Sequence, residues 1–207
     1  MYKLGRGVAF MAAFVLLSSF RTSTEKEDWK LGEDKDGIKI YTRKSEQGKI
    51  RTSKAEMYLN VSTAKVLEVL SDFNGYSKWF PDCQEAKVLK KISDNESISH
   101  LIYKTPWPLP NVDCVQRIVV DKPIKDTTYI HVHAEPNYIG PSGSCARVKQ
   151  MQGSWKIVAV PGGVFVTNIY SSDMGGIVPA WLANTQVVEI PFNIFCNMRA
   201  YITGKKK

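Results

Sequence analysis

The sequence predicts an α+β domain in which one antiparallel sheet packs against a long C-terminal helix. Three observations support this prediction. Residues 84–173 carry only strand and turn signals, residues 179–203 show the apolar spacing of a helix, and the links between the predicted strands are short. Short links between consecutive strands favour antiparallel pairing. The chain has 207 residues, 43% of them hydrophobic, and no linker or repeat, which suits a single domain.

The first elements come after an apolar leader. Residues 29–60 alternate apolar and polar side chains and break at Gly37 and Gly48, which predicts two strands joined by a turn. The apolar period then lengthens to that of a helix. Ser62 suits the N-cap of this helix, and the Asn74-Gly75 pair marks its end.

A meander of strands and a final helix follow. The proline-rich segment Thr105–Asn111 interrupts the strands as a stiff, apolar loop, and Gly153 is expected in a turn. Pro179 and Gly204 bound the helix, and Pro191 should kink it. The predicted strands are Glu85–Ile92, Ser97–Tyr103, Asp113–Asp121, Thr127–Glu135, Cys145–Gln152, Trp155–Val160 and Val164–Asp173.

The N-terminus has the layout of a secretory signal peptide. Lys3 and Arg6 precede an apolar run from Val8 to Leu17, and small and polar residues follow. We therefore expect an exported protein, periplasmic or secreted, with residues 1–23 as leader, 27–203 as the domain and 204–207 as a basic tail. An uncleaved N-terminal membrane anchor is the alternative, although the run is short for a membrane span.

Charge and cysteine spacing narrow the possible partners. The formal net charge is +8, but the basic residues are scattered rather than gathered in a stripe with stacking aromatics, which argues against nucleic-acid binding. An anionic membrane surface is the better transient partner. Four cysteines, Cys83, Cys114, Cys145 and Cys196, lack C-x-x-C spacing, which argues against a zinc site. We expect four free thiols by default, although one disulfide is possible in an oxidising compartment.

A possible metal motif lies in one predicted strand. His131, His133 and Glu135 share one face of it, because side chains alternate along a strand, and H-x-H followed by an acid is a metal-ligand pattern. A third imidazole could come only from His100. A polar sheet face is the preferred interpretation, and we predict no metal and no cofactor.

Several motifs, in the same order, resemble the START (StAR-related lipid transfer) family. "DGIKIYTRK" is similar to the family's opening strand, "VLSDFNGYSKWFP" to its following helix, and "PWPLPNVDCV" to its proline loop. The most specific match is "DMGGIVPAWLANTQVVEIPFNIFCNMR", which resembles the stretch that opens the family's C-terminal helix. The chain departs from the family at Val112 and Cys114, where arginine and an aromatic residue are common.

The resemblance implies a helix-grip (START-like) fold, in which a curved antiparallel sheet wraps around the C-terminal helix and leaves an internal cavity. Such a cavity would bind a lipid or another apolar small molecule, since burial of apolar surface stabilises the complex by about 25 cal/mol per Å². The proline loop and the start of the helix would form a gate, here represented by Leu109 and Val178. The expected ligand-binding residues are Tyr103, Trp107, Arg117, Arg147, Asn168, Tyr170, Trp181 and Val187.

The sequence allows more than one role for the two arginines and more than one function for the domain. Arg117 and Arg147 would pair with a ligand head group or with a buried acid, or would point to solvent. No motif predicts catalysis, so we expect a monomeric, non-enzymatic binding protein. The alternatives are a cyclase/aromatase-like enzyme that uses Tyr103, Arg117, Asn168 and Tyr170, and a protein-interaction module with a filled core.

Overall fold

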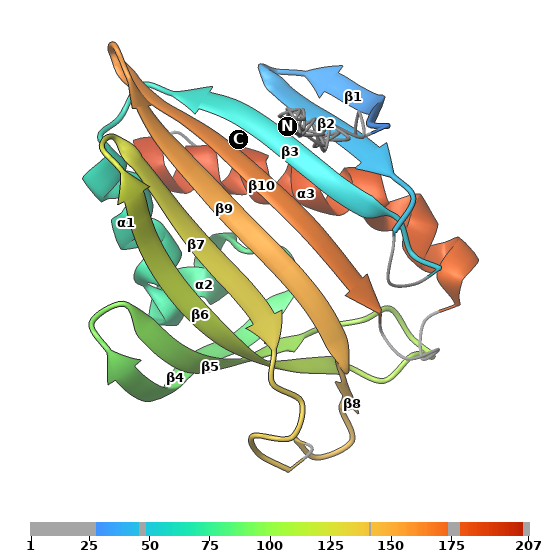
Figure 1. The fold of residues 1–207 in the computed structure, drawn as a ribbon. Helices are drawn as coiled ribbons and strands as arrows, with labels where there is room; N and C mark the ends of the chain where they lie inside the picture. The colour runs from blue at the N-terminus through green and yellow to red at the C-terminus, as the bar shows by residue number, and fades with distance from the viewer. Residues whose placement is uncertain (1–27, 46–48, 141, 174–178, 205–207) are drawn as a thin grey trace, which may run out of the picture.

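The computed structural model describes residues 28–45, 49–140, 142–173 and 179–204, and it has the predicted α+β architecture. A ten-stranded, curved sheet forms one layer, and the long helix α3 (Ala180–Thr203) passes behind it in Figure 1. Nine strands follow the order β1-β2-β3-β10-β9-β7-β6-β5-β4, all antiparallel, and β8 pairs with β6 in parallel. The strands are β1 (Lys30–Lys35), β2 (Ile38–Arg43), β3 (Thr52–Leu59), β4 (Cys83–Ser93), β5 (Glu96–Tyr103), β6 (Val112–Ile124), β7 (Thr127–Ala134), β8 (Ala146–Arg147), β9 (Gln150–Val160) and β10 (Gly163–Asp173).

Two local predictions were wrong. The stretch before the first helix contains three strands, because Asp36 and Gly37 adopt positive φ angles and turn the chain between β1 and β2. Gly153 lies inside β9 rather than in a turn, so the two strands predicted for this stretch reduce to a two-residue β8 and one long β9. The backbone hydrogen bonds of a central strand override the breaking tendency of one glycine.

The predicted helix ends agree more closely with the structure. Ser62 caps α1 (Thr63–Ser71), accepting a hydrogen bond from the backbone N–H of Lys65. The 3₁₀ turn η1 (Phe73–Gly75) and α2 (Tyr76–Trp79) complete the segment between β3 and β4. The helix α3 ends at Gly204 in the left-handed conformation, as expected for a glycine C-cap, and runs through Pro191. No helix in the described ranges combines the length and apolarity needed to cross a membrane.

The main core lies between the sheet and the C-terminal half of α3. Phe195 and Met198 are 0% exposed, and Phe195 stacks on Trp155 of β9 with ring centroids 5.8 Å apart. Helix α1 and the aromatic residues of α2 close the same end of the molecule. The predicted leader (residues 1–23) and most of the predicted tail lie outside the described residues.

Candidate functional site

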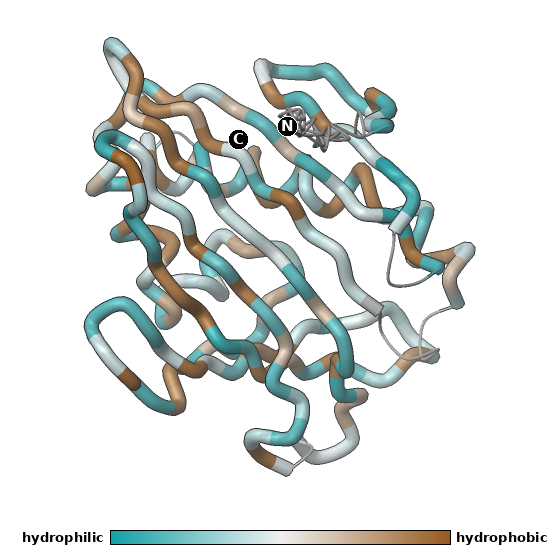
Figure 2. Tube along the Cα trace, in the orientation of Figure 1, coloured by the Kyte–Doolittle hydropathy of each residue, from teal (hydrophilic) through white to brown (hydrophobic). Residues whose placement is uncertain are grey.

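The sheet face that meets α3, called the inner face below, changes character along its strands. In β10 the inner-face positions run from Val164 and Val166, which are fully buried, through Asn168 to Tyr170, which is 41% exposed. In Figure 2 strands β9 and β10 change accordingly from brown to pale and teal along their length. One end of the inner face is therefore aliphatic, and the other is polar and less buried.

The helix shows the same gradient from the opposite side. Val187 lies seven residues before Ile194 and therefore on the same helix face, since seven residues make almost two turns. Ile194 is buried, whereas Val187 is half-buried and is not among the residues that pack against the core. Burial along this face of α3 therefore decreases from Ile194 toward the N-terminus of the helix.

Two tyrosines face this region from different strands. Tyr170 lies over Gly153, where an added Cβ would come within 3.3 Å of the Tyr170 ring, so the glycine in mid-strand provides space for the tyrosine. Burial raises the pKa of Tyr103 well above its ordinary value, and the nearby Cys114 and Tyr170 add to the shift. Burial likewise raises the pKa of Tyr170. Both hydroxyls therefore stay protonated at neutral pH and can donate hydrogen bonds.

Buried polar side chains that sequence reasoning missed complete the inner face. Gln116 of β6 is 8% exposed, and its cross-strand neighbour Ser99 is fully buried with no hydrogen-bond partner for its hydroxyl among the described residues. Buried polar groups normally have a partner. The missed signal was the inward alternation of β6, which places Gln116 between Cys114 and Ile118. The predicted Asn168 donates from its side chain to the Ser154 carbonyl oxygen, 3.1 Å away.

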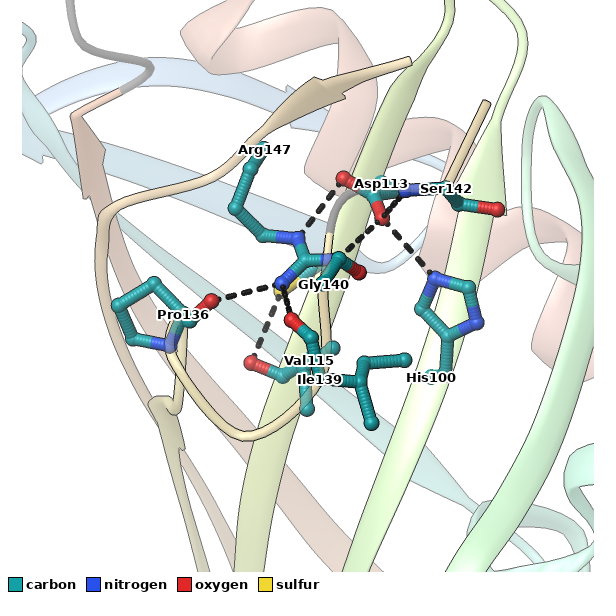
Figure 3. A network of polar contacts seen from close by, with 9 residues as sticks. His100, Asp113, Val115, Pro136, Ile139, Gly140, Ser142 and Arg147 are labelled. Carbon is teal, nitrogen blue, oxygen red and sulfur yellow. Dashed lines mark hydrogen bonds and ion pairs between the residues drawn. The ribbon is translucent and has the colours of Figure 1, made fainter. Parts of the chain in front are cut away.

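Arg147 does not face the ligand region but fastens the outer side of the sheet. It donates to both carboxylate oxygens of Asp113, at 2.9 and 2.7 Å, and also to the carbonyl oxygens of Pro136, Ile139 and Gly140. His100 contacts the same carboxylate at 3.1 Å, so that both side chains converge on Asp113 (Figure 3). Of the roles considered for Arg147, the structure shows pairing with a buried acid. We call Asp113, His100, Arg147 and the loop residues 135–140 and Ser142 the latch.

Electrostatics hold the latch together. Asp113 is 0% exposed, and burial alone would raise its pKa, but hydrogen bonds from Arg147 and His100 outweigh this effect and hold the pKa below its ordinary value. The hydrogen bonds to Asp113 in turn raise the pKa of Arg147. The carboxylate is therefore ionised and paired under neutral conditions.

Arg117 also lies on the outer face. It contacts Glu135 at 2.7 Å and Glu96 in a short ion pair. Two acids thus occupy its guanidinium, away from the inner face. The arginine candidates therefore have structural partners in this structure, while Tyr103, Asn168 and Tyr170 occupy inward positions of the sheet, with Tyr103 near Tyr170.

The gate region is only partly described. The proline loop is an ordered turn, in which the side chain of Thr105 donates to the carbonyl oxygens of Leu109 and Pro110. Trp107 at its tip is 92% exposed, and Trp181 in the first turn of α3 is 71% exposed. Val178, the second gate residue, lies outside the described residues.

Asn184 anchors the open half of α3. Its amide nitrogen donates to the Lys49 carbonyl oxygen at 3.1 Å, and its side-chain oxygen accepts from the Arg51 backbone N–H at 2.8 Å. This residue belongs to the motif that opens the helix, so its position in the sequence pattern has a structural cause. These hydrogen bonds, together with the packing of Val188 against the core, hold the N-terminal half of α3.

The histidine and cysteine candidates do not form a metal site in the described part of the chain. No group of three His, Cys, Asp or Glu residues there is placed to hold a metal ion. His133 lies 3.6 Å from Glu135, whereas His100 belongs to the latch. All four cysteines are free, and burial raises the pKa of Cys114 to about 12. A thiol with so high a pKa is a poor nucleophile.

Comparisons with known proteins agree with this geometry. The START domain family model matches residues 17–202. An uncharacterised protein of Pseudomonas aeruginosa is 31% identical over 175 residues, which are 84% of this chain and 86% of that protein. The crystal structure of a STAR-related lipid transfer protein from Xanthomonas axonopodis has a TM-score of 0.79 at 33% identity, and the match covers 84% of this chain and 98% of that one.

A more distant relative shows how far the fold extends. Human StAR-related lipid transfer protein 5 has a TM-score of 0.79 at only 13% identity, with 87% of this chain and 89% of that chain covered. At this identity the likeness concerns the fold alone. The family model, the bacterial relatives and the helix-grip architecture lead to one conclusion: the chain belongs to the START domain family, whose members bind lipids or other apolar ligands.

Proposed function

We propose that this protein binds a lipid without chemical conversion, between the inner face of the sheet and the N-terminal half of α3. The observation that carries the proposal is the loss of burial along one helix face, from Ile194 at 8% exposed to the half-buried Val187. A filled-core interaction module would bury both positions alike. An acyl chain or ring system in this region would remove the remaining apolar surface from water.

The polar groups of the inner face would orient the ligand. The Tyr103 and Tyr170 hydroxyls and the Gln116 amide lie on the inward positions of β5, β10 and β6. Three hydrogen-bonding groups suit a head group with one or two polar atoms. The high pKa values of Cys114 and both tyrosines argue against nucleophilic or base catalysis by these groups at neutral pH.

Ligand entry would take place at a membrane surface. Trp107 and Trp181 are highly exposed and flank the two ends of the expected gate, and tryptophan side chains favour the membrane–water interface. The net charge of +8 favours anionic lipids. We further propose, on the basis of the basic and apolar N-terminal sequence, that the protein is exported. We also propose that it acts as a monomer.

The direct test is a substitution that fills the proposed site with a larger side chain. Val187→Phe should lower binding of a fluorescent phospholipid and a fluorescent sterol at least tenfold, because the larger ring occupies the unfilled space. Stability should remain equal or rise. Thr185→Phe is the matched control, since Thr185 is exposed and lies on the opposite side of the same helix, and it should bind both probes as the unchanged protein does.

Two outcomes would contradict the proposal. If Val187→Phe and Thr185→Phe bind the probes equally well, the ligand lies elsewhere. If native mass spectrometry of protein purified from its own host shows no co-purifying lipid, and neither probe binds after delipidation, the filled-core interpretation is correct instead.

A further inference from the structure

The inner face can be followed across the sheet by the pairing of its strands. Trp155 of β9 lies on this face, because its ring stacks on Phe195 of α3. Directly paired residues of antiparallel strands share a face, so Asn168 on β10 and Ile130 on β7 lie on it as well. Every second residue along each strand continues the same face. The register therefore identifies the inward residues of each strand from β2 to β5 in the sheet order.

These inward residues carry no charged side chain. The chain contains 28 lysines and arginines and 20 aspartates and glutamates. Within the described residues, however, no Asp, Glu, Lys, Arg or His stands at an inward position of β2, β3, β5, β7, β9 or β10, or of β6 from Val112 to Val120. Of the two charged residues of α3, Glu189 is exposed, and Arg199 donates to the Asp36 carbonyl oxygen. The polar end of the inner face is therefore uncharged.

Charged residues of the same strands point outward, where several of them form ion pairs. On β3, Lys54 lies 3.1 Å from Glu56. On β6, Asp113 is held by Arg147 and His100 in the latch. These residues alternate with the uncharged inward ones. The strands therefore keep their charges on the outer face and uncharged hydrogen-bonding groups on the inner face.

Hydroxyl and amide groups make up the polar end of the inner face. Thr42, Ser53 and Tyr170 are direct cross-strand neighbours on β2, β3 and β10. Gln116 and Ser99 are cross-strand neighbours on β6 and β5. Burial raises the pKa of Tyr170, so its hydroxyl also stays neutral at neutral pH. Hydroxyl and amide groups both donate and accept hydrogen bonds, which suits the hydroxyl and carbonyl groups of a ligand.

The Ser99 hydroxyl is the group that most directly calls for a ligand atom. Ser99 is 0% exposed, and its hydroxyl has no hydrogen-bond partner in the part of the chain that the structure describes. A buried hydroxyl without a partner is unfavourable. A hydroxyl or carbonyl oxygen of a bound lipid would supply the missing hydrogen bond without bringing a charge into the interior.

A charged head group would be unfavourable at this end. A phosphate or carboxylate group that leaves water loses its hydration, and this loss is offset only by a counter-charge together with hydrogen bonds. The inward residues of the seven strands named above offer hydrogen bonds but no counter-charge. A charged head group would therefore have to remain in water, outside the site.

We propose that the ligand is an uncharged lipid whose polar part carries hydroxyl or ester carbonyl groups, as in an acylglycerol, rather than a phospholipid or a fatty acid. The Ser99 hydroxyl and the Gln116 amide bind this polar part from β5 and β6, and the Tyr170 hydroxyl binds it from β10. The inference rests on the proposed function, because it places the lipid on the inner face.

Two lipids with equal acyl chains test the inference. Delipidated protein that carries one of the two fluorescent probes is titrated with dioctanoylglycerol and with dioctanoyl phosphatidic acid, each at concentrations at which it is monomeric. We expect the uncharged lipid to displace the probe with an affinity about tenfold higher. Equal affinities, or a preference for phosphatidic acid, would overturn the inference and leave the proposed function intact. A protein that binds neither the probes nor these lipids would contradict both.

Variants connect the preference to the inward residues. Ser99→Ala should weaken dioctanoylglycerol binding about threefold to tenfold, as for the loss of one hydrogen bond. Its stability should not fall, because the hydroxyl has no partner among the described residues. Ser154→Ala, the same substitution at an outward position of β9, is the matched control and should leave affinity unchanged.

A charge added to the inner face should change the preference. Gln116→Lys supplies an inward counter-charge and should favour dioctanoyl phosphatidic acid over dioctanoylglycerol, with circular dichroism as the check that the variant is folded. An unchanged preference in folded Gln116→Lys protein would contradict the inference. Equal dioctanoylglycerol affinities of the Ser99→Ala and Ser154→Ala variants would contradict it as well.

Discussion

The two ends of the interior are built on different physical principles. At the end formed by the C-terminal half of α3, aliphatic and aromatic side chains such as Phe195, Met198 and Trp155 fill the space. At the other end the inner face carries Tyr170, Gln116 and other polar groups, and α3 presents a half-buried Val187. Apolar burial stabilises the first end, whereas the second leaves apolar surface for a ligand.

The ligand end has compensating polar contacts outside its inner face. The latch fastens residues 135–140 to the outside of β6, and Asn184 ties α3 to the residues that precede β3. Folding therefore need not depend on a filled interior at this end. A binding protein requires this arrangement, because it must be stable both with and without ligand.

The largest expected effect separates the two halves of α3. Phe195→Ala should lower the free energy of unfolding by about 3–5 kcal/mol, as for other buried phenylalanines. Val187→Ala should lower it by less than about 1 kcal/mol in ligand-free protein, because Val187 is half-buried. Urea denaturation measures both values. Similar losses for the two variants would mean that both ends are equally packed.

The latch should be the next strongest contributor. Asp113→Asn should lower the free energy of unfolding by about 3 kcal/mol, because it leaves the buried Arg147 guanidinium without its counter-charge. The control is Glu135→Gln, which weakens the more exposed pair with Arg117 and should cost less than about 1 kcal/mol. A neutral Asp113→Asn substitution would show that the loop is held by other contacts.

The pH dependence of stability provides a test of the same residue. The pKa of Asp113 is lower in the folded protein than in the unfolded chain, where it is about 3.9. Its contribution is therefore fully present above about pH 5 and is lost as the pH falls through the folded pKa. Urea midpoints between pH 6 and pH 3 should decline less steeply for Asp113→Asn. Parallel curves for the two proteins would contradict a depressed pKa.

The smallest expected effect lies at the ligand end. Tyr170→Phe should leave the free energy of unfolding within about 0.5 kcal/mol but weaken lipid binding about threefold to tenfold, as for the loss of one hydrogen bond. Tyr138→Phe, at another residue that is 41% exposed, is the matched control and should leave affinity unchanged. A large stability loss with unchanged affinity would make Tyr170 a structural residue.

Much of the fold followed from local sequence signals. The cap at Ser62, the glycine that ends α3 and the strand alternation of residues 84–173 each depend on neighbouring residues alone. Gly153 was misassigned for the same reason. Its local preference favours a turn, but pairing with β7 and β10 on both sides keeps the strand continuous.

For the candidate site, too, the sequence predicted some features correctly and others incorrectly. Asn168 and Tyr170 were both named as candidates, and the structure places both on the inner face. Alternation cannot tell which of two faces is inner. Arg117 and Arg147 were therefore placed among ligand-binding candidates, although both lie on the outer face with acidic partners.

The sequence alone determined the fold class, the family resemblance and the order of the elements, because these depend on periodicity and motifs within short stretches. Only the tertiary structure decided which end of the interior is filled, that Arg147 closes a latch with Asp113 and that the inward strand positions around the proposed site are uncharged. Each of these features joins residues that are distant in the chain. Their positions depend on the curvature and register of the whole sheet, which no single segment specifies.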